Sequence, residues 1–296
     1  MSAIPPENML LAVPKKGRLN EKVMKLLVDG VGMEYRRPDR VDVAHCTNMP
    51  VTLVFLPAHD IATYVGEGNV DMGITGEDVI RETEPSTGIV ETVMSLGFGH
   101  CQLAVQAPIT DNVKSASELA GKRIVTSFPE ITRKFFAQYE TAETGPTKIK
   151  FVSGSVEAAC GLGLADGIVD LVETGTTMRA AGLEIVEKIM DTQAVVIKNP
   201  SAEHPTMVSK FKSRIEGYHT ATQFQLIQYN VRKEDIAACL KLTPGKRSPT
   251  ISSLDQTGYM AVSALVKKAD AATIMDGLAE AGADSVLIFN IANSRM

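Results

Sequence analysis

The densest group of residues that could do chemistry lies between positions 166 and 177. Asp166 and Asp170 flank a short apolar run, and the residues Thr-Gly-Thr-Thr follow at 174–177. Consecutive backbone amides at the start of a helix bind phosphate, and threonine hydroxyls add further donors. A carboxylate such as Asp170 accepts hydrogen bonds from ribose hydroxyls. The pattern suits a phosphorylated sugar, and the alternative is that the threonines and the glycine merely cap a helix.

A second cluster, Lys15-Lys16-Gly17-Arg18, follows the first predicted strand. Three cations around a glycine, at the carboxyl end of a strand, favour a clamp for a polyphosphate or a carboxylate. A solvated basic turn is the alternative, and it is the commoner fate of such a run. The position at the ligand-binding edge of the expected sheet favours binding.

Three further segments carry weaker signals. Glu77 and Asp78 follow Gly76 at the start of a predicted helix, where acidic side chains cap amides and complement the helix dipole. Capping is the favoured interpretation of Asp78. Residues 153–157 form another hydroxyl-rich loop before a helix, with the same ambiguity. Arg133 is expected either to reach the cleft or to lie on a helix surface.

Several kinds of site are missing from the sequence. The five histidines show no metal-binding spacing, and the four cysteines form no CxxC pair, so no protein metal ligand is predicted. The sequence also lacks GxSxG, GxxxxGK[ST] and GxGxxG motifs. These absences argue against a zinc site, a disulfide scaffold, a covalent hydrolase, a P-loop NTPase and a Rossmann dehydrogenase.

The amino-acid composition limits the classes of partner that the protein is expected to bind. The formal net charge of −5 means that an anionic ligand must be held by local cations or backbone amides, and it argues against nonspecific nucleic-acid binding. No apolar run reaches the length of a membrane span, and the first residues show no charged-then-apolar leader pattern. We therefore expect a cytoplasmic protein without nucleic-acid or membrane partners.

Alternating elements position these motifs in the first two-thirds of the chain. Short β-branched runs alternate with amphipathic stretches, which predicts parallel sheets with helices on both faces and a ligand cleft between two α/β lobes. The strands are expected at 10–13, 51–56, 71–75, 101–106, 122–127, 149–152, 168–172 and 194–197, and helices at 20–30, 60–65 and 131–139. Asn20 and Gly30 are expected to cap the first helix. The strand at 194–197 is expected to return to the first lobe.

The tail has a different pattern. Strands are predicted near 223–231, 250–254, 259–266 and 285–291, and helices at 234–240 and 271–281. The resulting βαββαβ order is that of a ferredoxin-like unit, and such appended units commonly regulate or oligomerise. We assign 1–104 and 190–219 to a discontinuous lobe I, 105–189 to lobe II with the loop expected to bind a phosphorylated sugar, and 220–296 to a regulatory domain.

Taken in order along the chain, five motifs resemble the ATP phosphoribosyltransferase family in its long form. They are Lys16–Leu19, Asp71–Asp78, Leu96–Cys101, Val152–Glu157 and Gly163–Thr177. The tail, including Ser248–Ile251, resembles the family's C-terminal histidine-sensing domain. The doubled lysine at 15–16 departs from the family pattern and leaves open which lysine reaches the ligand. Extra length around 33–40 and 140–147 indicates loop insertions.

The resemblance implies a reaction and an assembly. ATP and 5-phosphoribosyl pyrophosphate would give N1-(5-phosphoribosyl)-ATP and pyrophosphate with Mg²⁺, the first step of L-histidine biosynthesis, under feedback inhibition by histidine. A two-lobed periplasmic-binding-protein-like core and dimers that assemble into hexamers are also implied. The implied catalytic residues are Asp170, Arg18 and Lys16; the substrate-binding residues are Glu157, Asp166, Asp170, Thr174, Gly175, Thr176, Thr177, Arg133, Gly76 and Glu77; the histidine-binding residues are Asn230, Thr250 and Ser285.

Two other functions stay open. A two-lobed ligand-binding or sensor protein would bind without turnover, although the absent export signal and the 174–177 loop disfavour it. A catalytically inactive regulatory subunit is a third possibility, which the intact phosphate-loop residues argue against.

Overall fold

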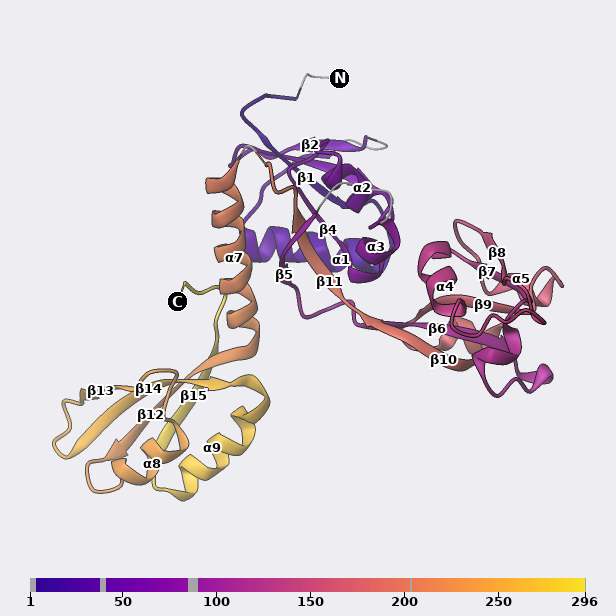
Figure 1. Cartoon of the computed structure of the whole chain (residues 1–296). Coiled ribbons are helices and arrows are strands. Elements are labelled where there is room, and N and C mark those ends of the chain that lie inside the picture. Colours follow the sequence, from indigo (N-terminus) through magenta and orange to yellow (C-terminus); the bar gives the residue numbers. More distant parts are fainter. Residues whose placement is uncertain (1–3, 38–40, 85–89, 203, 296) are drawn as a thin grey trace. The chain divides into compact units, whose positions relative to one another are not determined.

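The computed structural model describes residues 4–37, 41–84, 90–202 and 204–295. The chain divides into two compact units, Met1–Val23 with Glu34–Pro205, and Met24–Met33 with Thr206–Met296. The first unit holds two sheets and the second unit holds one (Figure 1). Within the described residues, no helix combines the length and the apolar character that crossing a membrane requires.

The first sheet has three parallel strands at its centre and antiparallel strands on both sides. Its order is β2 (Val43–His45), β3 (Val51–Leu56), β1 (Met9–Pro14), β4 (Met72–Gly76), β11 (Ala194–Lys198) and β5 (Glu91–Ser95). Strands β1, β3 and β4 run parallel, whereas β2, β11 and β5 pair antiparallel with their neighbours. The expected all-parallel sheet is therefore wrong in this respect, because β11 returns from the second sheet in the reverse direction.

The helix after β1 begins earlier than the sequence predicted. Helix α1 spans Gly17–Lys25, so that Asn20 lies inside it instead of capping it. A π-helical segment, η1 (Leu26–Val31), continues the helix and contains Gly30. The segment ends at Gly32, whose φ of 75° is one that a residue without a Cβ adopts readily. Two further helices, α2 (Ile61–Gly66) and α3 (Glu77–Thr83), accompany this sheet.

The second sheet is also mixed. Its order is β10 (Leu183–Thr192), β6 (Cys101–Pro108), β9 (Gly167–Val172), β7 (Arg123–Thr126) and β8 (Lys148–Phe151). Strands β9, β7 and β8 run parallel, and β6 lies antiparallel between β10 and β9. The ten-residue β10 was not predicted. Helices α4 (Pro129–Phe136), α5 (Ala158–Gly161) and α6 (Thr176–Ala180) belong to this lobe, with short 3₁₀ turns η2 (Ile109–Asp111) and η3 (Ala116–Leu119).

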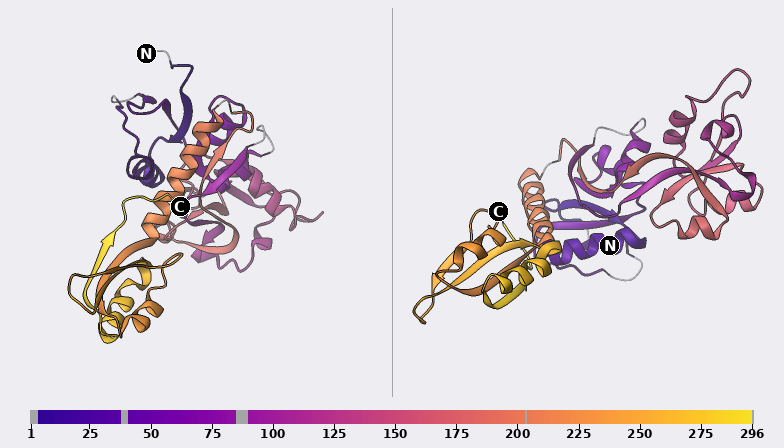
Figure 2. Two further views of the ribbon diagram at one scale, coloured as in Figure 1. Left: turned by 90° about the vertical axis from the view of Figure 1, so that its left-hand side faces the viewer. Right: turned by 90° about the horizontal axis from the view of Figure 1, so that it is seen from below.

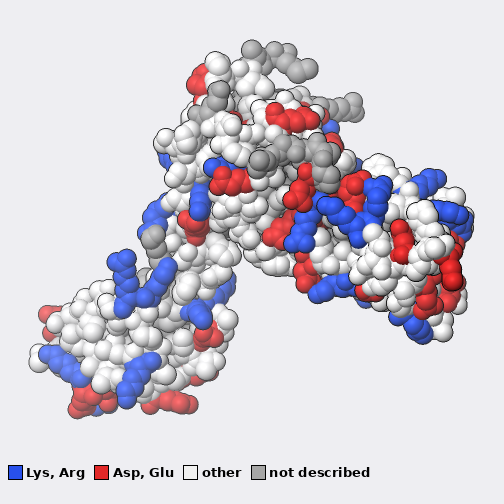
Figure 3. Space-filling view, viewed as in Figure 1, with Lys and Arg blue, Asp and Glu red and all other residues white. Residues whose placement is uncertain are grey.

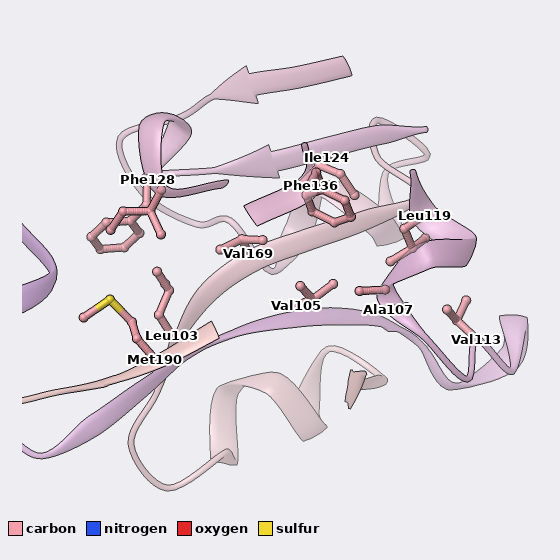
Figure 4. Packing of buried hydrophobic residues seen from close by; sticks show 12 residues of the cluster. Leu103, Val105, Ala107, Val113, Leu119, Ile124, Phe128, Phe136, Val169 and Met190 are labelled. Atoms are coloured by element: carbon pink, nitrogen blue, oxygen red, sulfur yellow. The ribbon is translucent and has the colours of Figure 1, made fainter. Parts of the chain in front are cut away.

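One face of this second sheet carries a continuous apolar core. Side chains from β6 and β9, such as Val105 and Val169, face Phe128 and Phe136 at the two ends of α4 (Figure 4). Phe136 is fully buried, and burial of aromatic side chains of this size dominates the stability of such a core. The core therefore holds α4 against the sheet at both ends of the helix.

Two connections join the sheets of the first unit (Figure 1). One runs from β5 to β6, and the other consists of Gln193 between β10 and β11. The two connections are hydrogen-bonded to each other, since Leu96 N donates to Ala194 O at 2.9 Å and Ala194 N donates to Phe98 O at 3.0 Å. The two lobes of the first unit are therefore joined by two adjacent chain segments, which we call the hinge.

The second unit contains a four-stranded antiparallel sheet and the long helix α7 (Pro205–Gln223). The strand order is β13 (Thr250–Ser253), β14 (Tyr259–Lys267), β12 (Phe224–Arg232) and β15 (Asp284–Asn290). Helices α8 (Ile236–Leu242) and α9 (Ala271–Glu280) pack on the same face, against buried residues of β12 and β14 (Figure 2), and the turn η4 (Lys268–Asp270) precedes α9. The chain order of these elements is βαββαβ.

Helix α7 belongs to the second compact unit. Arg214 of α7 donates to the backbone oxygen of Val31 at 2.7 Å, which ties the helix to the segment 24–33 of the same unit. The compact units therefore divide at 205/206. The functional boundary that the sequence analysis placed at 219/220 stays a prediction.

Candidate active site

A cleft lies between the two lobes of the first unit, where β4 and β9 end. It consists of two adjoining cavities of about 250 and 270 Å³, which share Ala58, Asp78, Val79 and Leu171 in their linings. The first lobe contributes the loop after β3 and helix α3. The second contributes the end of β9 and the start of α4. This is the edge at which α/β sheets bind ligands.

The Thr-Gly-Thr-Thr loop begins at the rim of this cleft. Leu171 and Glu173 line the larger cavity, and Thr174 follows directly. Gly175 has a φ of 70° and forms the N-cap of α6. The Thr174 and Thr176 hydroxyls lie 3.0 Å apart, and both side chains are exposed. The loop therefore follows a lining residue directly, although none of residues 174–177 is itself part of either cavity lining.

Arg179 supports the shape of the loop from behind. Its Nη2 donates to the backbone oxygen of Thr174 at 2.8 Å. A Cβ placed on Gly175 would lie 2.7 Å from Nη1 of the same arginine. Because this position also needs a positive φ, glycine is the residue that fits it.

Asp170 lies on β9 and lines the smaller cavity. Its side chain is half-buried, and Oδ1 accepts a hydrogen bond from Leu171 N at 2.9 Å. Burial raises the pKa of Asp170 to about 6, against a partial lowering by the Leu171 amide, and the charge of Glu157 raises it further. The carboxylate is therefore ionised but poorly solvated near neutral pH.

Asp166 lies at the other end of β9 and has a different partner. Its Oδ1 receives Nη2 of Arg123 at 2.7 Å, and its Oδ2 receives Nε of Arg123 at 3.1 Å. The Arg123 guanidinium and the Arg123 backbone amide lower the pKa of Asp166 to about 2, although partial burial opposes this. The structure does not bring Asp166 to the 174–177 loop, because the length of β9 separates them.

Two cations face the cleft from α1. Arg18 and Lys22 both line the larger cavity and both contact Glu173, at 3.0 and 3.5 Å. Lys15 instead pairs with Asp42 at 2.8 Å, whereas Lys16 is exposed. Figure 3 shows basic and acidic side chains interspersed over the visible face, so anion binding depends on such local groups.

The start of α3 forms the floor shared by both cavities. The N-cap of α3 is Gly76, which makes no side-chain cap hydrogen bond, and Asp78 lies in the first turn, where the Asp78 and Val79 amides hydrogen-bond its carboxylate. Asp78 is buried, and its Oδ1 accepts a hydrogen bond from the Thr192 hydroxyl at 2.5 Å. Burial raises the pKa of Asp78, while the Thr192 hydroxyl lowers it. A Cβ on Gly76 would overlap the Asp78 carboxyl group.

Glu77 and Gln193 connect α3 with the hinge. Glu77 N donates to Gln193 O at 3.1 Å, and the Gln193 side-chain amide donates to Glu77 Oε1 at 3.3 Å. Gly76 and Gln193 line the larger cavity, and Glu77 does not appear in its lining. The acidic pair at 77–78 is therefore used mainly to join α3 to the connection between the lobes.

Two other predicted residues lie away from the lining of both cavities. Glu157 is half-buried at the N-cap position of α5, and its charge acts on Asp170. Arg133 pairs with Glu130 one turn earlier on α4, which is the helix-surface position that the sequence left open. The linings contain neither residue.

The predicted inhibitor residues share one sheet of the second unit. Asn230 on β12 pairs with Asp284, next to Ser285 of β15, whose φ is 51°. Thr250 begins β13 at the opposite edge and pairs with Ser263. Asn230 and Ser285 are thus on adjacent strands, and Thr250 is separated from them by β14.

Sequence reasoning missed several residues of the cleft. Lys22, Glu82, Glu173 and Thr192 were not selected, and Asp78 was interpreted as a cap. Lys22 follows Arg18 by four residues, which places both on one face of a helix and could have been recognised. The others act across the lobes, at sequence separations of 48 to 155 residues, and no local pattern reveals them.

Comparisons with known proteins agree with the site. The family model described as ATP phosphoribosyltransferase matches residues 57–217, and the model described as HisG, C-terminal domain, matches 221–293. The ATP phosphoribosyltransferase of Yarrowia lipolytica is 48% identical over 294 residues, covering 98% of this chain and 97% of that protein. The Saccharomyces cerevisiae protein of the same name is 45% identical with the same coverage.

A solved structure is also similar. It is described as the ATP phosphoribosyl transferase (HisG:HisZ) complex from Thermotoga maritima, with 28% identity and a TM-score of 0.58. The match covers 70% of this chain and 98% of that chain. The sequence motifs, the cleft and the full-length similarity to these enzymes agree. The chain belongs to the ATP phosphoribosyltransferase family.

Proposed function

We propose that this chain transfers the 5-phosphoribosyl group of 5-phosphoribosyl pyrophosphate to N1 of ATP and releases pyrophosphate, the first step of L-histidine biosynthesis. The observation that carries the proposal is the left-handed Gly175 bend, which carries exposed threonine hydroxyls at the start of α6 and directly follows Glu173 of the interlobe cleft. The full-length similarity to ATP phosphoribosyltransferases supports it independently.

The 5-phosphate binds at the bend. Residues Thr174 to Thr177 supply hydroxyl donors, and the amides that open α6 add donors with a favourable dipole. Arg179 keeps the bend in shape through its contact with the Thr174 oxygen. Charge-assisted hydrogen bonds of this kind are shorter and stronger than neutral ones.

The ribose binds beside Asp170. Its carboxylate accepts hydrogen bonds from the ribose hydroxyls and offers negative charge to the anomeric carbon, which becomes oxocarbenium-like as pyrophosphate departs. Burial in the cleft makes this charge more effective than it would be in water. The negative charge of Glu157 also acts on Asp170.

The pyrophosphate is received by the cations of α1 and the preceding turn. Arg18 and Lys22 line the larger cavity, and Lys16 precedes them on an exposed turn. In the present arrangement Glu173 neutralises Arg18 and Lys22. A bound pyrophosphate carries more charge than one carboxylate and replaces Glu173 as their partner.

The chemistry needs orientation more than proton transfer. Adenine N1 already carries a lone pair, so that no strong general base is required. Holding N1 and the anomeric carbon in line converts a bimolecular step into an effectively unimolecular one. The absence of an acid–base dyad from the predicted motifs is consistent with this mechanism.

The residues fit a magnesium ion that travels with the substrate. Among the described residues, no group of three or more His, Cys, Asp or Glu side chains could hold a metal ion. Mg²⁺ is commonly bound by one or two carboxylates together with substrate phosphates. Asp170 and Glu157 are the carboxylates that would complete such a set. When bound, the ion neutralises charge on the departing pyrophosphate.

The architecture extends the proposal. The core is a pair of periplasmic-binding-protein-like lobes, and residues 220–296 are a ferredoxin-like regulatory domain. The two mixed sheets of the first unit and the βαββαβ order of the tail support these assignments. Histidine binds this domain through Asn230, Thr250 and Ser285 and inhibits the enzyme. The protein acts in the cytoplasm as a dimer that assembles into hexamers.

Pyrophosphate release tests the proposal. Release should require ATP, 5-phosphoribosyl pyrophosphate and Mg²⁺ together, and it should fall when histidine is added. A protein that binds one of these ligands saturably but never releases pyrophosphate would be a sensor instead of an enzyme. Retained inhibition after removal of 220–296 would move the histidine site elsewhere.

A further inference from the structure

Helix α4 begins without a side-chain cap from its own segment. Phe128 occupies the N-cap position without a side-chain cap hydrogen bond, and Pro129 follows. The Thr126 hydroxyl accepts from Phe128 N at 2.9 Å, which leaves the Glu130 and Ile131 amides to a partner from elsewhere. A helix leaves its first four N–H groups without intrahelical partners. Capping groups normally come from the N-cap residue, and their loss destabilises the helix.

Glu82 of the other lobe supplies the missing cap. Its Oε1 accepts from Glu130 N at 2.8 Å, and its Oε2 accepts from Ile131 N at 2.9 Å. Both oxygens of one carboxylate are therefore used on the first turn of α4, 48 residues further along the chain. The contact joins α3 of lobe I to α4 of lobe II.

The surroundings of Glu82 make this contact resistant to solvent. The side chain is half-buried and lines the smaller cavity together with Asp170. Burial raises the pKa of Glu82, and the two amides lower it. On α4, the Glu130 charge raises this pKa and Arg133 lowers it. His59 and Asp78 are the other titratable groups of that cavity.

The opposite end of α3 is fixed to the hinge. Asp78 accepts from the Thr192 hydroxyl, and Glu77 exchanges hydrogen bonds with Gln193. Helix α3 is thus attached at its start to the segment that joins the lobes, and near its end to α4. A short helix held at both ends acts as a strut across the cleft.

A second contact between the lobes differs from the Glu82 contact. Arg18 pairs with Glu173, but the Arg18 side chain is 74% exposed and that of Glu173 is 39% exposed. Exposed ion pairs are weak and exchange readily. Arg18 is also one of the cations that receive pyrophosphate in the proposed reaction. The Glu82 contact uses no group that the substrates need, so it can persist during binding.

We propose that Glu82 is a positioning residue, which caps α4 across the cleft and holds the two lobes at the separation that keeps Asp170 out of water. The inference rests on the proposed function for its kinetic effects and on the hydrogen bonds alone for its structural effect. Loss of the Glu82 carboxylate frees α4, widens the smaller cavity and lets water reach Asp170.

The test compares Glu82→Ala and Glu82→Gln with Glu84→Gln, a change to an exposed carboxylate on the C-cap of the same helix. Hydrogen exchange is measured on the full-length protein without ligands. Exchange at the Glu130 and Ile131 amides should accelerate at least about tenfold in Glu82→Ala, less in Glu82→Gln, and not at all in Glu84→Gln. Unchanged exchange at both amides would overturn the proposal.

Kinetics supply the second readout. Glu82→Ala should raise the KM for 5-phosphoribosyl pyrophosphate about tenfold with a smaller fall in kcat. Glu82→Gln, which retains one acceptor, should lie in between. Equal losses of kcat and thermal stability with an unchanged KM would make Glu82 merely structural.

The two readouts separate this inference from the function on which it depends. If the wild-type protein shows no turnover, the proposed reaction is wrong. Accelerated exchange confined to the first turn of α4 in Glu82→Ala would still support the role of Glu82 as a contact between the lobes. If turnover is present and exchange is unchanged, the strut is wrong and the reaction stands. Should Glu82→Ala not fold, Glu82→Gln decides by the same criteria.

Discussion

Strand β9 carries an aspartate at each end, and the two ends place these identical side chains in opposite environments. Asp166, just before the strand, is paired with Arg123, and its pKa is lowered to about 2. Asp170, near the far end, lines the smaller cavity, whose described lining contains no lysine or arginine, and burial raises its pKa to about 6. The charge of Asp166 is compensated by a cation of the same chain, whereas the charge of Asp170 is left available to a ligand.

The difference separates structural from functional acids within one motif. A group whose charge is compensated by its own protein has little left to offer a substrate, whereas a desolvated, uncompensated charge gains most when a ligand supplies donors. The resemblance assigned both aspartates to the sugar. The geometry supports that role for Asp170 and favours a structural role for Asp166.

The largest expected effect is on Asp170→Asn. Turnover should fall about 100-fold or more, because the amide cannot stabilise positive charge at the anomeric carbon. Stability should rise at pH 8 by about 2 kcal/mol, since the desolvated charge is removed. Steady-state kinetics and urea unfolding of the same preparation measure both. A parallel loss of folding and activity would make Asp170 structural.

The pH dependence of that stability gain has a definite sign. The folded state raises the pKa of Asp170 from 3.8 to about 6, so the wild-type cost is absent below pH 4 and complete above pH 6. The unfolding free energies of wild type and Asp170→Asn should therefore converge at acidic pH and separate between pH 4 and pH 6. A constant difference across this range would contradict the assignment.

The catalytic rate should follow the same group. We expect kcat/KM of the wild type to fall below about pH 6, by about tenfold per unit, as Asp170 is protonated. Asp166→Asn should leave this limb unmoved and serves as the matched control on the same strand. An acid limb that shifts in Asp166→Asn would mean that the two ends of β9 are coupled.

A smaller effect is expected for Asp166→Asn itself. Activity should stay within about threefold of wild type, and stability at pH 7 should fall by about 1 kcal/mol with the loss of a bidentate, partly exposed ion pair. Because the folded state lowers this pKa to about 2, the stabilisation should be present above pH 4 and disappear as the pH falls toward 2. Chemical unfolding between pH 2 and pH 7 measures this trend. A loss of substrate binding would return Asp166 to the site.

The smallest effect is expected for Glu173→Gln. Removing the carboxylate releases Arg18 and Lys22, so the affinity for pyrophosphate should increase about twofold to threefold at low salt. The gain should shrink as ionic strength rises, since these groups are exposed. Weaker pyrophosphate binding in the variant would show that Glu173 helps to order the two cations.

Much of the fold was predictable from local patterns. The β-branched runs located β1, β3 and β9, and the βαββαβ order of the tail matches the observed elements. The antiparallel strands were not predictable in the same way. Strand direction depends on where the chain returns, and β10, with its alternating charged and apolar residues, lacks the continuous apolar run of a buried strand.

The residues of the candidate site differ in the same way: some belong to a local sequence motif, and others depend on distant partners. Residues 170 and 174–177 form a local motif, and the sequence alone could single them out. Residues such as Glu82, Glu173 and Asp78 act through partners in another lobe or in the hinge, and nothing next to them in the sequence names those partners. The pairing that distinguishes Lys15 from Lys16 also depends on a distant residue, Asp42.

Calorimetric titration of 5-phosphoribosyl pyrophosphate with Mg²⁺ into wild type, Thr177→Val and Asp166→Asn tests the central claim most directly. The wild type should bind saturably, and Thr177→Val should bind about tenfold more weakly, since one hydroxyl donor to the phosphate is lost. Asp166→Asn should match the wild type. Unaltered binding by Thr177→Val together with lost binding by Asp166→Asn would place the sugar phosphate at the wrong end of β9.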